Sequence, residues 1–543
     1  MKKILLFFSV VLFYTSHCKA QPGLMTVAEK SDFKSTSRYA DVIDFIDHLK
    51  NMSPYVRVEK IATSVDGRDV PLLVIGNPLP KSPAELKNDS RIVVYIQADI
   101  HAGEVEGKEA SLMFARDLLK KKNPELLEKV VILICPLFNP DGNEKISTMN
   151  RTNQNGPVNG VGVRYNGQCL DLNRDGMKAE SPEVRGLLQN VFNRWDPSVF
   201  MDCHTTDGSY HVEPVTFTWM VNPAGDTSLI DYMRTTMVPE ISHTLATKYN
   251  VENCYYGEFF DLMNPEKGWL FDAAEPRYIV NLFGIRNRLG ILNENYVYAD
   301  YKSRVLGCYA LIGSLLQYTD AHGTEIKNMV REVDRKTIAR GENPGVADSF
   351  PVEYKVRPLP EKVMIRTYEA DTVTLPNGRK TYRRSNRQRD VTVPYFIDYY
   401  PVKSVRLPYA YILSTKDPSV VELLKMHGIK IEMLAGEVRL NVERFNVGNI
   451  KSASRANQGH HINAVSGLYV NDTIVFPAGT LVIRTAQPLA NVAAYLLEPQ
   501  TDDGMAAWNF FDRCLIPQWG RGYNPYPVYR LMNRTKLNIM NFR

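Results

Sequence analysis

The chain lacks a large excess of charge of either sign. Its 543 residues include 65 lysines and arginines against 60 aspartates and glutamates, a formal net charge of +5. Three of the positive charges, Lys2, Lys3 and Lys19, lie in an N-terminal segment that we expect to be removed. The remaining chain is close to neutral, which argues against nucleic-acid binding, because proteins of that class concentrate basic residues.

Long apolar runs are also rare. Residues 4–13 are apolar but too few to span a bilayer, so residues 1–20 resemble a signal peptide cleaved after Ala20. Lipid attachment at Cys18 is disfavoured because Thr15, three residues earlier, is not aliphatic. No later run is long and apolar enough for a membrane helix. The sequence therefore predicts a secreted or periplasmic protein without a transmembrane segment.

Paired C-x-x-C motifs and internal repeats are absent as well. Six cysteines remain after cleavage, and export permits disulfides. However, Cys135 lies in an apolar run and Cys203 directly precedes a candidate metal ligand. We therefore expect mostly buried thiols, with at most one or two disulfides.

Candidate metal ligands are present at the ends of predicted strands. His101 and Glu104 follow the apolar run 91–100, and His204 ends the segment M-D-C-H. Two imidazoles and one carboxylate suit a catalytic zinc ion, because three protein ligands leave the fourth position open. The H-x-x-E pair alone is weak, since a surface histidine and a glutamate stabilised by a helix dipole give the same pattern.

Two further motifs support the interpretation of His101 and Glu104 as metal ligands. N-P-D-G occupies 139–142, and R-Y-N-G-Q-C-L-D-L-N-R occupies 164–174. Together with H-x-x-E, a later lone histidine and a late glutamate, they resemble the zinc metallocarboxypeptidase family, of the carboxypeptidase A/E type. The spacing of the two arginines in the second motif is similar to that of the carboxypeptidase E/D-like branch, and the chain looks like a secreted bacterial-type member. The resemblance covers about residues 30–320; Asp175 departs from it, since many members have Asn there.

The resemblance implies a role for each matching position, beginning with one zinc ion per chain on the three ligands. Arg164 would face the scissile carbonyl and its oxyanion, while Asn173 and Arg174 would hold the terminal carboxylate of the substrate. Asp171 would accept a hydrogen bond from His101 and fix its tautomer. The alternative is that the arginines are solvated surface residues and that Asn173 and Asp171 are turn residues.

The catalytic base is expected at Glu294, which ends the apolar segment 289–296. A charge beside such a run is costly to bury unless it has a partner or a task. The resemblance places the catalytic glutamate at such a strand end, although Glu294 could instead cap the next helix. Glu258 and Glu275 are the competing candidates.

A mobile tyrosine that closes over the substrate is also implied by the resemblance. Tyr278 is the first candidate and Tyr256 the second. Arg286 and Arg288 either line the same cleft or lie in a solvated loop. The side-chain preference at the substrate C-terminus stays open.

Strand-like apolar runs alternate with amphipathic helical segments. Expected strands lie near 91–98, 130–136, 198–202 and 289–293, and expected helices near 106–121, 182–194, 227–248 and 303–318. This alternation predicts an α/β layered fold with a largely buried sheet. The resemblance implies a three-layer α/β/α sandwich around a mixed central sheet.

Composition changes after the predicted catalytic domain, which we place at 21–325. A charged helix near 324–340 leads to G-E-N-P-G at 341–345, a predicted linker. Residues 345–543 read as a β-rich accessory region of unknown role, with one helix near 419–429. The pair His460–His461 is not expected to bind a metal ion, because adjacent histidines point in different directions and no third ligand accompanies them.

The sequence thus predicts a secreted zinc-dependent carboxypeptidase. Its substrates would be peptide or protein C-termini, hydrolysed by zinc-activated water with Glu294 as general base. One alternative is a zinc amidohydrolase or peptidase that acts on cell-wall stem peptides. Another is an inactive zinc-bearing binding protein.

Overall fold

The structure is a computed structural model that describes residues 23–206 and 208–542. The predicted signal peptide, residues 1–20, lies outside the described residues. Within them, no helix is long and apolar enough to cross a membrane. Their six cysteines are all free thiols.

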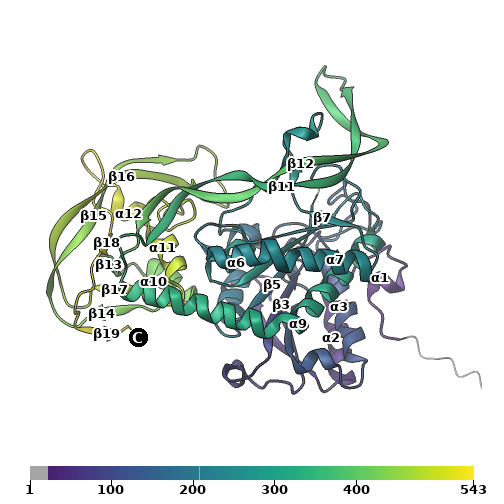
Figure 1. Cartoon of the computed structure of the whole chain (residues 1–543), viewed down its shortest axis with the longest axis horizontal. Coiled ribbons are helices and arrows are strands. Elements are labelled where there is room, and N and C mark those ends of the chain that lie inside the picture. The colour runs from purple at the N-terminus through teal and green to yellow at the C-terminus, as the bar shows by residue number, and fades with distance from the viewer. Residues whose placement is uncertain (1–22, 207, 543) are drawn as a thin grey trace, which may run out of the picture.

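An eight-stranded mixed sheet forms the centre of the catalytic part (Figure 1). Its strand order is β1-β2-β4-β3-β5-β10-β6-β7. The strands are β1 Val56–Thr63, β2 Asp69–Ile75, β3 Ile92–Ala98, β4 Val130–Cys135, β5 Val199–Thr206, β6 Val215–Trp219, β7 Asn253–Tyr255 and β10 Leu289–Tyr296. The four central strands, β4, β3, β5 and β10, run parallel. They are almost entirely buried, as expected of parallel strands covered on both faces.

Two groups of helices cover the sheet. On one face α2 (Tyr39–Met52), α3 (Glu106–Leu119) and α9 (Tyr301–Glu342) pack on one another, and the last two also contact central strands. On the other, α5 (Pro182–Gly186) contacts β1, and α8 (Ile279–Ile285) contacts β5 and β10. The predicted three-layer α/β/α sandwich with a mixed sheet is confirmed.

Shorter elements complete this part of the chain. They are α1 Val27–Lys30, α4 Pro140–Asn143, α6 Thr227–Tyr232, α7 Val238–Lys248, β8 Glu258–Phe259, β9 Trp269–Leu270, and the short turns Pro83–Lys87, Glu125–Glu128, Leu172–Arg174 and Pro265–Lys267. Wider π-type turns, Leu187–Phe192 and Met233–Met237, follow α5 and α6. The helices expected near 182–194 and 227–248 therefore each contain an irregular turn.

Helix α9 differs from the prediction of two helices. It runs for 42 residues without a break, from the N-cap Asp300, whose side chain accepts from the Ser303 amide. Gly323, near the expected interruption, stays helical because it packs closely on the sheet: a Cβ there would lie 2.9 Å from Ile92. Gly341, in the predicted linker, still belongs to this helix, and a Cβ there would meet the Thr485 backbone at 2.2 Å.

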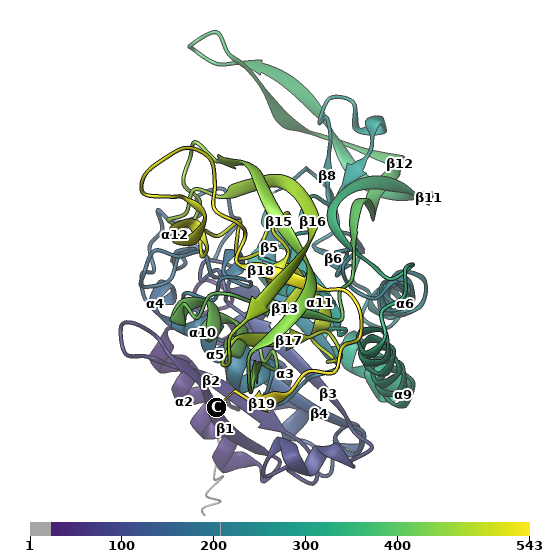
Figure 2. The same ribbon diagram turned by 90° about the vertical axis from the view of Figure 1, so that its left-hand side faces the viewer.

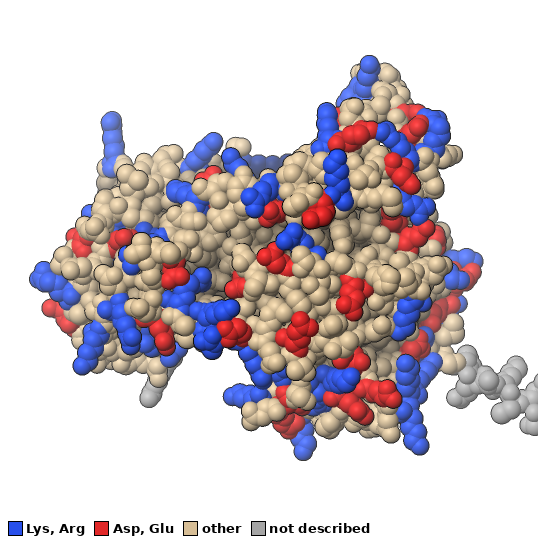
Figure 3. Space-filling view, in the orientation of Figure 1, with Lys and Arg blue, Asp and Glu red and all other residues tan. Residues whose placement is uncertain are grey.

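The C-terminal part is rich in strands, as the sequence predicts. A long hairpin of β11 (Ser349–Thr374) and β12 (Lys380–Arg406) extends beyond the catalytic part, and β12 pairs with β9 (Figures 1 and 2). A seven-stranded sheet follows, in the order β16-β15-β18-β13-β17-β14-β19. Its strands are β13 Ala410–Leu413, β14 Glu432–Leu434, β15 Val438–Ser452, β16 Asn463–Phe476, β17 Leu481–Arg484, β18 Val528–Leu531 and β19 Ile539–Asn541, accompanied by α10 Pro418–Met426, α11 Ala490–Leu497 and α12 Asp512–Leu515. Figure 3 shows basic and acidic residues interspersed over one face of both parts.

His427, which ends α10, joins the two parts of the molecule. Its ring Nε2 lies 2.9 Å from the carbonyl oxygen of Met177, and its own carbonyl accepts from Arg286 Nη1. The ring is fully buried, and this burial lowers the pKa of His427 from 6.5 to about 4. The neutral imidazole is therefore the form that the folded protein holds.

This burial predicts a loss of stability in acid. Between pH 6.5 and about 4 the unfolded chain protonates His427 while the folded chain does not, so the unfolding free energy falls as pH falls through this window. The loss attributable to this group should reach about 3 kcal/mol. Denaturant unfolding of wild type and His427→Gln at pH 7 and pH 4 measures it, with the exposed His243→Gln as control. Equal pH dependence in wild type and His427→Gln would contradict the assignment.

Candidate active site and metal centre

The three predicted metal ligands meet at the ends of two neighbouring strands. His101 and Glu104 follow β3, and His204 lies on β5, which pairs with β3. His101 Nδ1 is 3.1 Å from Glu104 Oε1, His204 Nδ1 is 3.0 Å from Glu104 Oε2, and the two Nδ1 atoms are 3.3 Å apart. A tetrahedral zinc ion with bonds of about 2.0–2.1 Å needs ligand atoms about 3.3 Å apart. These residues could therefore hold zinc with little rearrangement.

A carboxylate lies behind each histidine. His101 Nε2 is 2.9 Å from Asp171 Oδ1, and His204 Nε2 is 3.1 Å from Asp202 Oδ2. Both carboxylates favour the tautomer with hydrogen on Nε2, which leaves the Nδ1 lone pairs directed at the metal position. Burial alone would raise the pKa of Asp171, but the His101 imidazole and the Arg164 guanidinium hold it far below its usual value.

Asp202 was not among the predicted site residues. It stands two positions before His204 in M-D-C-H, so its side chain lies on the same face of β5. That spacing was the available signal. Its other oxygen, Oδ1, accepts from Gln97 Nε2 at 3.2 Å, and the carboxylate is fully buried.

Asp202→Asn should lower zinc affinity by about 10- to 100-fold, the usual cost of losing a partner behind a metal-bound histidine. Asparagine keeps the shape but removes the charge that supports His204. Competition with a chromogenic chelator measures the affinity, and Asp272→Asn, on the cavity wall but away from the ligands, is the matched control. Unchanged zinc affinity in Asp202→Asn would show that this carboxylate does not support the metal.

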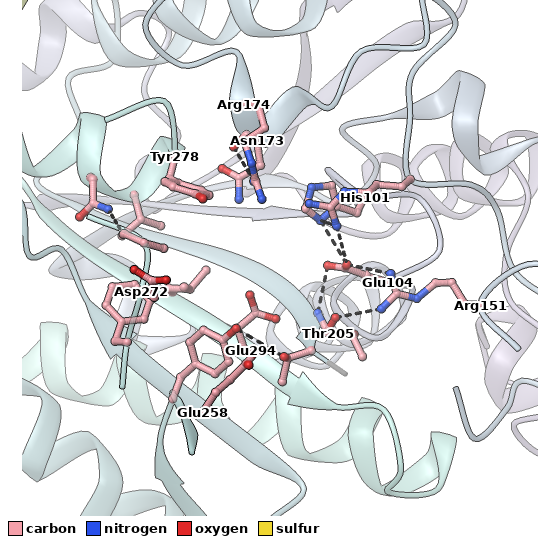
Figure 4. Close-up of a pocket in the computed structure, with 18 residues that line it drawn as sticks. His101, Glu104, Arg151, Asn173, Arg174, Thr205, Glu258, Asp272, Tyr278 and Glu294 are labelled. Carbon is pink, nitrogen blue, oxygen red and sulfur yellow. Dashed lines mark hydrogen bonds and ion pairs between the residues drawn. The ribbon is translucent and has the colours of Figure 1, made fainter. Parts of the chain in front are cut away.

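The remaining predicted residues border one cavity of about 470 Å³ next to this cluster (Figure 4). Its lining comes from segments far apart in sequence: His101, Glu104, Arg151, Arg164, Asn173, Arg174, Thr205, Thr206, Tyr256, Glu258, Phe271, Asp272, Ala273, Tyr278, Val280, Asn281, Leu292 and Glu294. Every predicted catalytic or substrate-binding residue is in this set. Asp171 and His204 lie directly behind the wall.

The two arginines of the R-x-N-x-x-x-x-D-L-N-R motif occupy different positions in the wall. Arg164 donates from Nε to Asp171 Oδ2 at 2.7 Å, and its Nη1 is 3.2 Å from His101 Nδ1, beside the metal position. Arg174 donates from Nη1 to the carbonyl oxygen of Asn173 at 3.0 Å, and its guanidinium lies 4.3 Å from the centre of the Tyr278 ring. The cavity therefore has one cation beside His101 and a second beside Tyr278, and both lie within 4 Å of Asp171.

Asn173 connects this segment to helix α8. Its side-chain oxygen accepts from the Ile279 amide at 3.0 Å, and its Nδ2 is 3.4 Å from His204 Nε2. Asp175, where the family resemblance implies Asn, does not line the cavity. Its buried carboxylate accepts from Lys178 Nζ and from the Ser181 amide and hydroxyl, and so orders the loop after Arg174.

Glu294 is paired in register with His204 on the adjacent parallel strand. Burial raises the pKa of Glu294 to about 8; the Glu104 carboxylate acts in the same direction and the His204 imidazole partly offsets it. Of the competing glutamates, Glu258 is exposed and borders the cavity from the edge strand β8, whereas Glu275 is not part of the lining.

Arg286 and Arg288 neither line the cavity nor lie in a solvated loop. Arg288 is buried and donates to the carboxylates of Asp196 and Asp334. Arg286 is buried beside His427. Both arginines stabilise contacts between segments distant from the site.

Arg151, which no motif predicts, also reaches the metal ligands. It donates from Nη1 to Glu104 Oε1 and from Nη2 to the carbonyl oxygen of Thr205, each at 3.0 Å. It lies in a loop outside all the recognised motifs, and nothing in its local sequence marks it.

The accessory region reaches the back of the site. The Asp171 amide donates to Gln458 Oε1 at 2.7 Å, and Arg277, next to Tyr278, is paired with Asp503 at 2.8 Å. His460, one of the adjacent histidines, lies 2.8 Å from Glu180 Oε1. The loops that carry the predicted carboxylate-binding residues are thus held from both parts of the chain.

Residues 42–258 match the family model for zinc carboxypeptidases. This segment of the chain is a zinc carboxypeptidase domain. The matched range contains the three metal ligands and both arginines of the motif and ends before Glu294. The enzyme is accordingly a zinc-dependent peptide hydrolase of the metallocarboxypeptidase type.

Curated relatives agree with this family. Carboxypeptidase 2 of Trichophyton rubrum is 22% identical over 487 residues, which covers 86% of this chain and 81% of the relative. That share exceeds what residues 21–325 could supply, so the similarity continues into the accessory region. Carboxypeptidase D of Rattus norvegicus is 29% identical over 195 residues, covering 34% of this chain and 13% of that protein.

Solved carboxypeptidase structures match a smaller share of this chain than the Trichophyton relative does. A metallo-carboxypeptidase from Burkholderia cenocepacia is 18% identical, covers 52% of this chain and 69% of its own, and has a TM-score of 0.36. Carboxypeptidase A from Helicoverpa armigera is 14% identical, covers 53% of this chain and 75% of its own, and has a TM-score of 0.39.

Proposed function

We propose that this zinc carboxypeptidase is exported and removes C-terminal residues from peptides and proteins, with Glu294 as general base. The observation that carries the proposal is a single cavity with the zinc ligands at one position and Arg174 at another. An exopeptidase needs both, because it must recognise a terminal carboxylate at a fixed distance from the bond it hydrolyses. Export is inferred from residues 1–20, and a mature N-terminus at Gln21 is the expected result of N-terminal sequencing.

Glu294 is best placed to move the proton. Zinc, when bound, polarises the scissile carbonyl and lowers the pKa of water towards 7. Glu294 takes the proton from the attacking water and donates it to the leaving amine. Its register position beside His204 supports this role, whereas Glu258 lies on the edge strand β8 and Glu275 is outside the lining.

Arg164 is assigned to the oxyanion that forms at the scissile carbonyl. Its salt bridge with Asp171 holds the guanidinium beside His101 before substrate arrives. A cation fixed in advance stabilises developing negative charge without reorganisation during the reaction.

Arg174, Asn173 and Tyr278 are assigned to the substrate carboxylate. A guanidinium can donate two parallel hydrogen bonds to a carboxylate. The Tyr278 ring lies against the Arg174 guanidinium, so movement of either affects the other. Tyr278 is preferred to Tyr256 as the covering residue because Tyr256 lies against Thr206, away from this arginine.

Arg174→Ala should lower kcat/KM for peptide hydrolysis by about 30-fold to several thousand-fold. This range corresponds to about 2–5 kcal/mol, the usual cost of removing one partner of a buried charge pair. The measurement compares matched peptides with a free carboxylate and with a C-terminal amide. Wild type should prefer the acid strongly, and Arg174→Ala should lose that preference while retaining its low rate on the amide. Arg383→Ala, on the exposed hairpin, is the control.

Other results of this comparison would change the assignment. A wild-type enzyme that cleaves acid and amide equally is not a carboxypeptidase. Cleavage of cell-wall stem peptides in preference to linear peptides would favour the amidohydrolase alternative. Stoichiometric zinc without cleavage of either substrate would favour an inactive binding protein.

A further inference from the structure

His211, Glu213 and Cys254 form a second group of potential metal ligands. One donor atom from each lies within 4.8 Å of the others. The three residues are 3%, 3% and 9% exposed. His211 and Glu213 belong to the segment between β5 and β6, and Cys254 lies on β7, which pairs with β6. None of them lines the catalytic cavity.

Two of these donor atoms are buried without a hydrogen-bond partner. Among residues 23–206 and 208–542, neither His211 Nδ1 nor Glu213 Oε2 has one, although they lie 3.6 Å from each other. That separation is too long for a hydrogen bond. Unpaired buried polar atoms are costly and rare in folded proteins. Two of them that face each other beside a thiol point to a group that would occupy the space between them.

The surroundings hold the donors in place. The His211 ring stacks on Tyr296, with centroids 3.7 Å apart, and meets the Trp269 ring edge-on. The other oxygen of Glu213, Oε1, accepts from the Arg366 amide at 3.4 Å. One carboxylate oxygen is thus engaged by β11, while the second faces His211 and Cys254. These contacts set the orientation of the His211 and Glu213 side chains before any ligand binds.

The location gives the group a structural setting. The segment with His211 forms a β-bridge with Thr367 of β11, and the Val212 amide donates to the carbonyl oxygen of Arg366 at 2.8 Å. Thr367 lies in the second half of β11, and the long β11–β12 hairpin extends beyond the catalytic part (Figure 1). An ion here would connect β7 to the β5–β6 segment, which is in turn bonded to β11 at Arg366 and Thr367.

We propose that His211, Glu213 and Cys254 bind a second zinc ion, which fastens the β11–β12 hairpin to the catalytic sheet. Imidazole nitrogen, carboxylate oxygen and thiolate sulfur are the donors that zinc accepts together. Binding releases the Cys254 thiol proton to solvent, and the sulfur then forms the bond to the metal. A solvent molecule would complete the tetrahedron. This proposal is independent of the peptide-hydrolysing function.

Cobalt substitution tests the proposal on the intact enzyme. The chain is freed of metal with a chelator, loaded with Co²⁺ and examined by near-ultraviolet absorption and elemental analysis. We expect two metal ions per chain and a thiolate-to-cobalt charge-transfer band. The catalytic ligands contain no sulfur and cannot produce that band. One ion per chain without the band would overturn the proposal, even if no variant folds.

Variants then assign the second ion to its ligands. Cys254→Ser should lose the charge-transfer band, and His211→Ala should bind one ion instead of two. Cys308→Ser, another buried thiol, is the matched control and should retain both ions and the band. A band that persists in Cys254→Ser, or disappears in Cys308→Ser, would show that another cysteine binds the metal and that the assignment is wrong.

Discussion

Glu294→Gln should lower kcat by roughly 10²- to 10⁴-fold, the range that a positioned acid–base group contributes. Glutamine preserves the shape of the side chain but cannot accept the proton of the attacking water. Zinc should remain bound, because Glu294 belongs to the cavity wall and is not one of the three clustered ligands. KM should change little, since the substrate carboxylate is held elsewhere. Steady-state kinetics together with metal analysis measures both effects.

The matched control is Glu258→Gln, which changes a second glutamate on the wall of the same cavity. We expect that variant to retain most of the wild-type kcat. If instead Glu258→Gln is inactive and Glu294→Gln turns over normally, the proton is carried from β8 and the assignment of the base is wrong.

His204→Ala should remove one metal ion per chain and reduce hydrolysis to the level of chelator-treated enzyme. In the proposed site His204 is one of three protein ligands, and its loss also leaves the Asp202 carboxylate buried without the imidazole. Elemental analysis after dialysis gives the metal content, and far-ultraviolet circular dichroism tests whether the fold is retained. The loss of one ion is expected whether the wild-type chain binds one ion or two.

The exposed His243→Ala on α7 serves as the control and should retain full metal content and activity. A folded His204→Ala enzyme that kept its zinc and its activity would contradict the ligand set. In that case the metal would have to be held by other residues.

The central fold could be predicted because its signals are local. Continuous apolar runs marked the buried parallel strands β3, β4, β5 and β10, and short motifs at their ends marked His101, Glu104 and His204. Strand ends at one edge of a sheet lie close together, so ligands about a hundred residues apart in sequence could be expected to meet. The family resemblance then supplied the roles that periodicity alone could not.

The residues around the site that the sequence did not predict contact partners far away in the sequence. Gln458 contacts the Asp171 amide, and Asp503 pairs with Arg277, from a region without any recognised motif. Arg151 reaches Glu104 from an irregular loop. Such contacts depend on tertiary arrangement and leave no periodic pattern. The unbroken helix α9 was missed for a related reason, because the helical Gly323 is accommodated by its packing on Ile92.

The measurement that tests the central claim most directly is digestion of a mixed peptide pool by the mature enzyme, followed by mass spectrometry with and without a chelator. The proposed carboxypeptidase should shorten peptides by single residues from the C-terminus. The chelator should stop this trimming and added zinc should restore it. The pool also reveals which C-terminal side chains are preferred. Internal cleavage, N-terminal trimming, or trimming that persists after zinc has been removed would contradict the account.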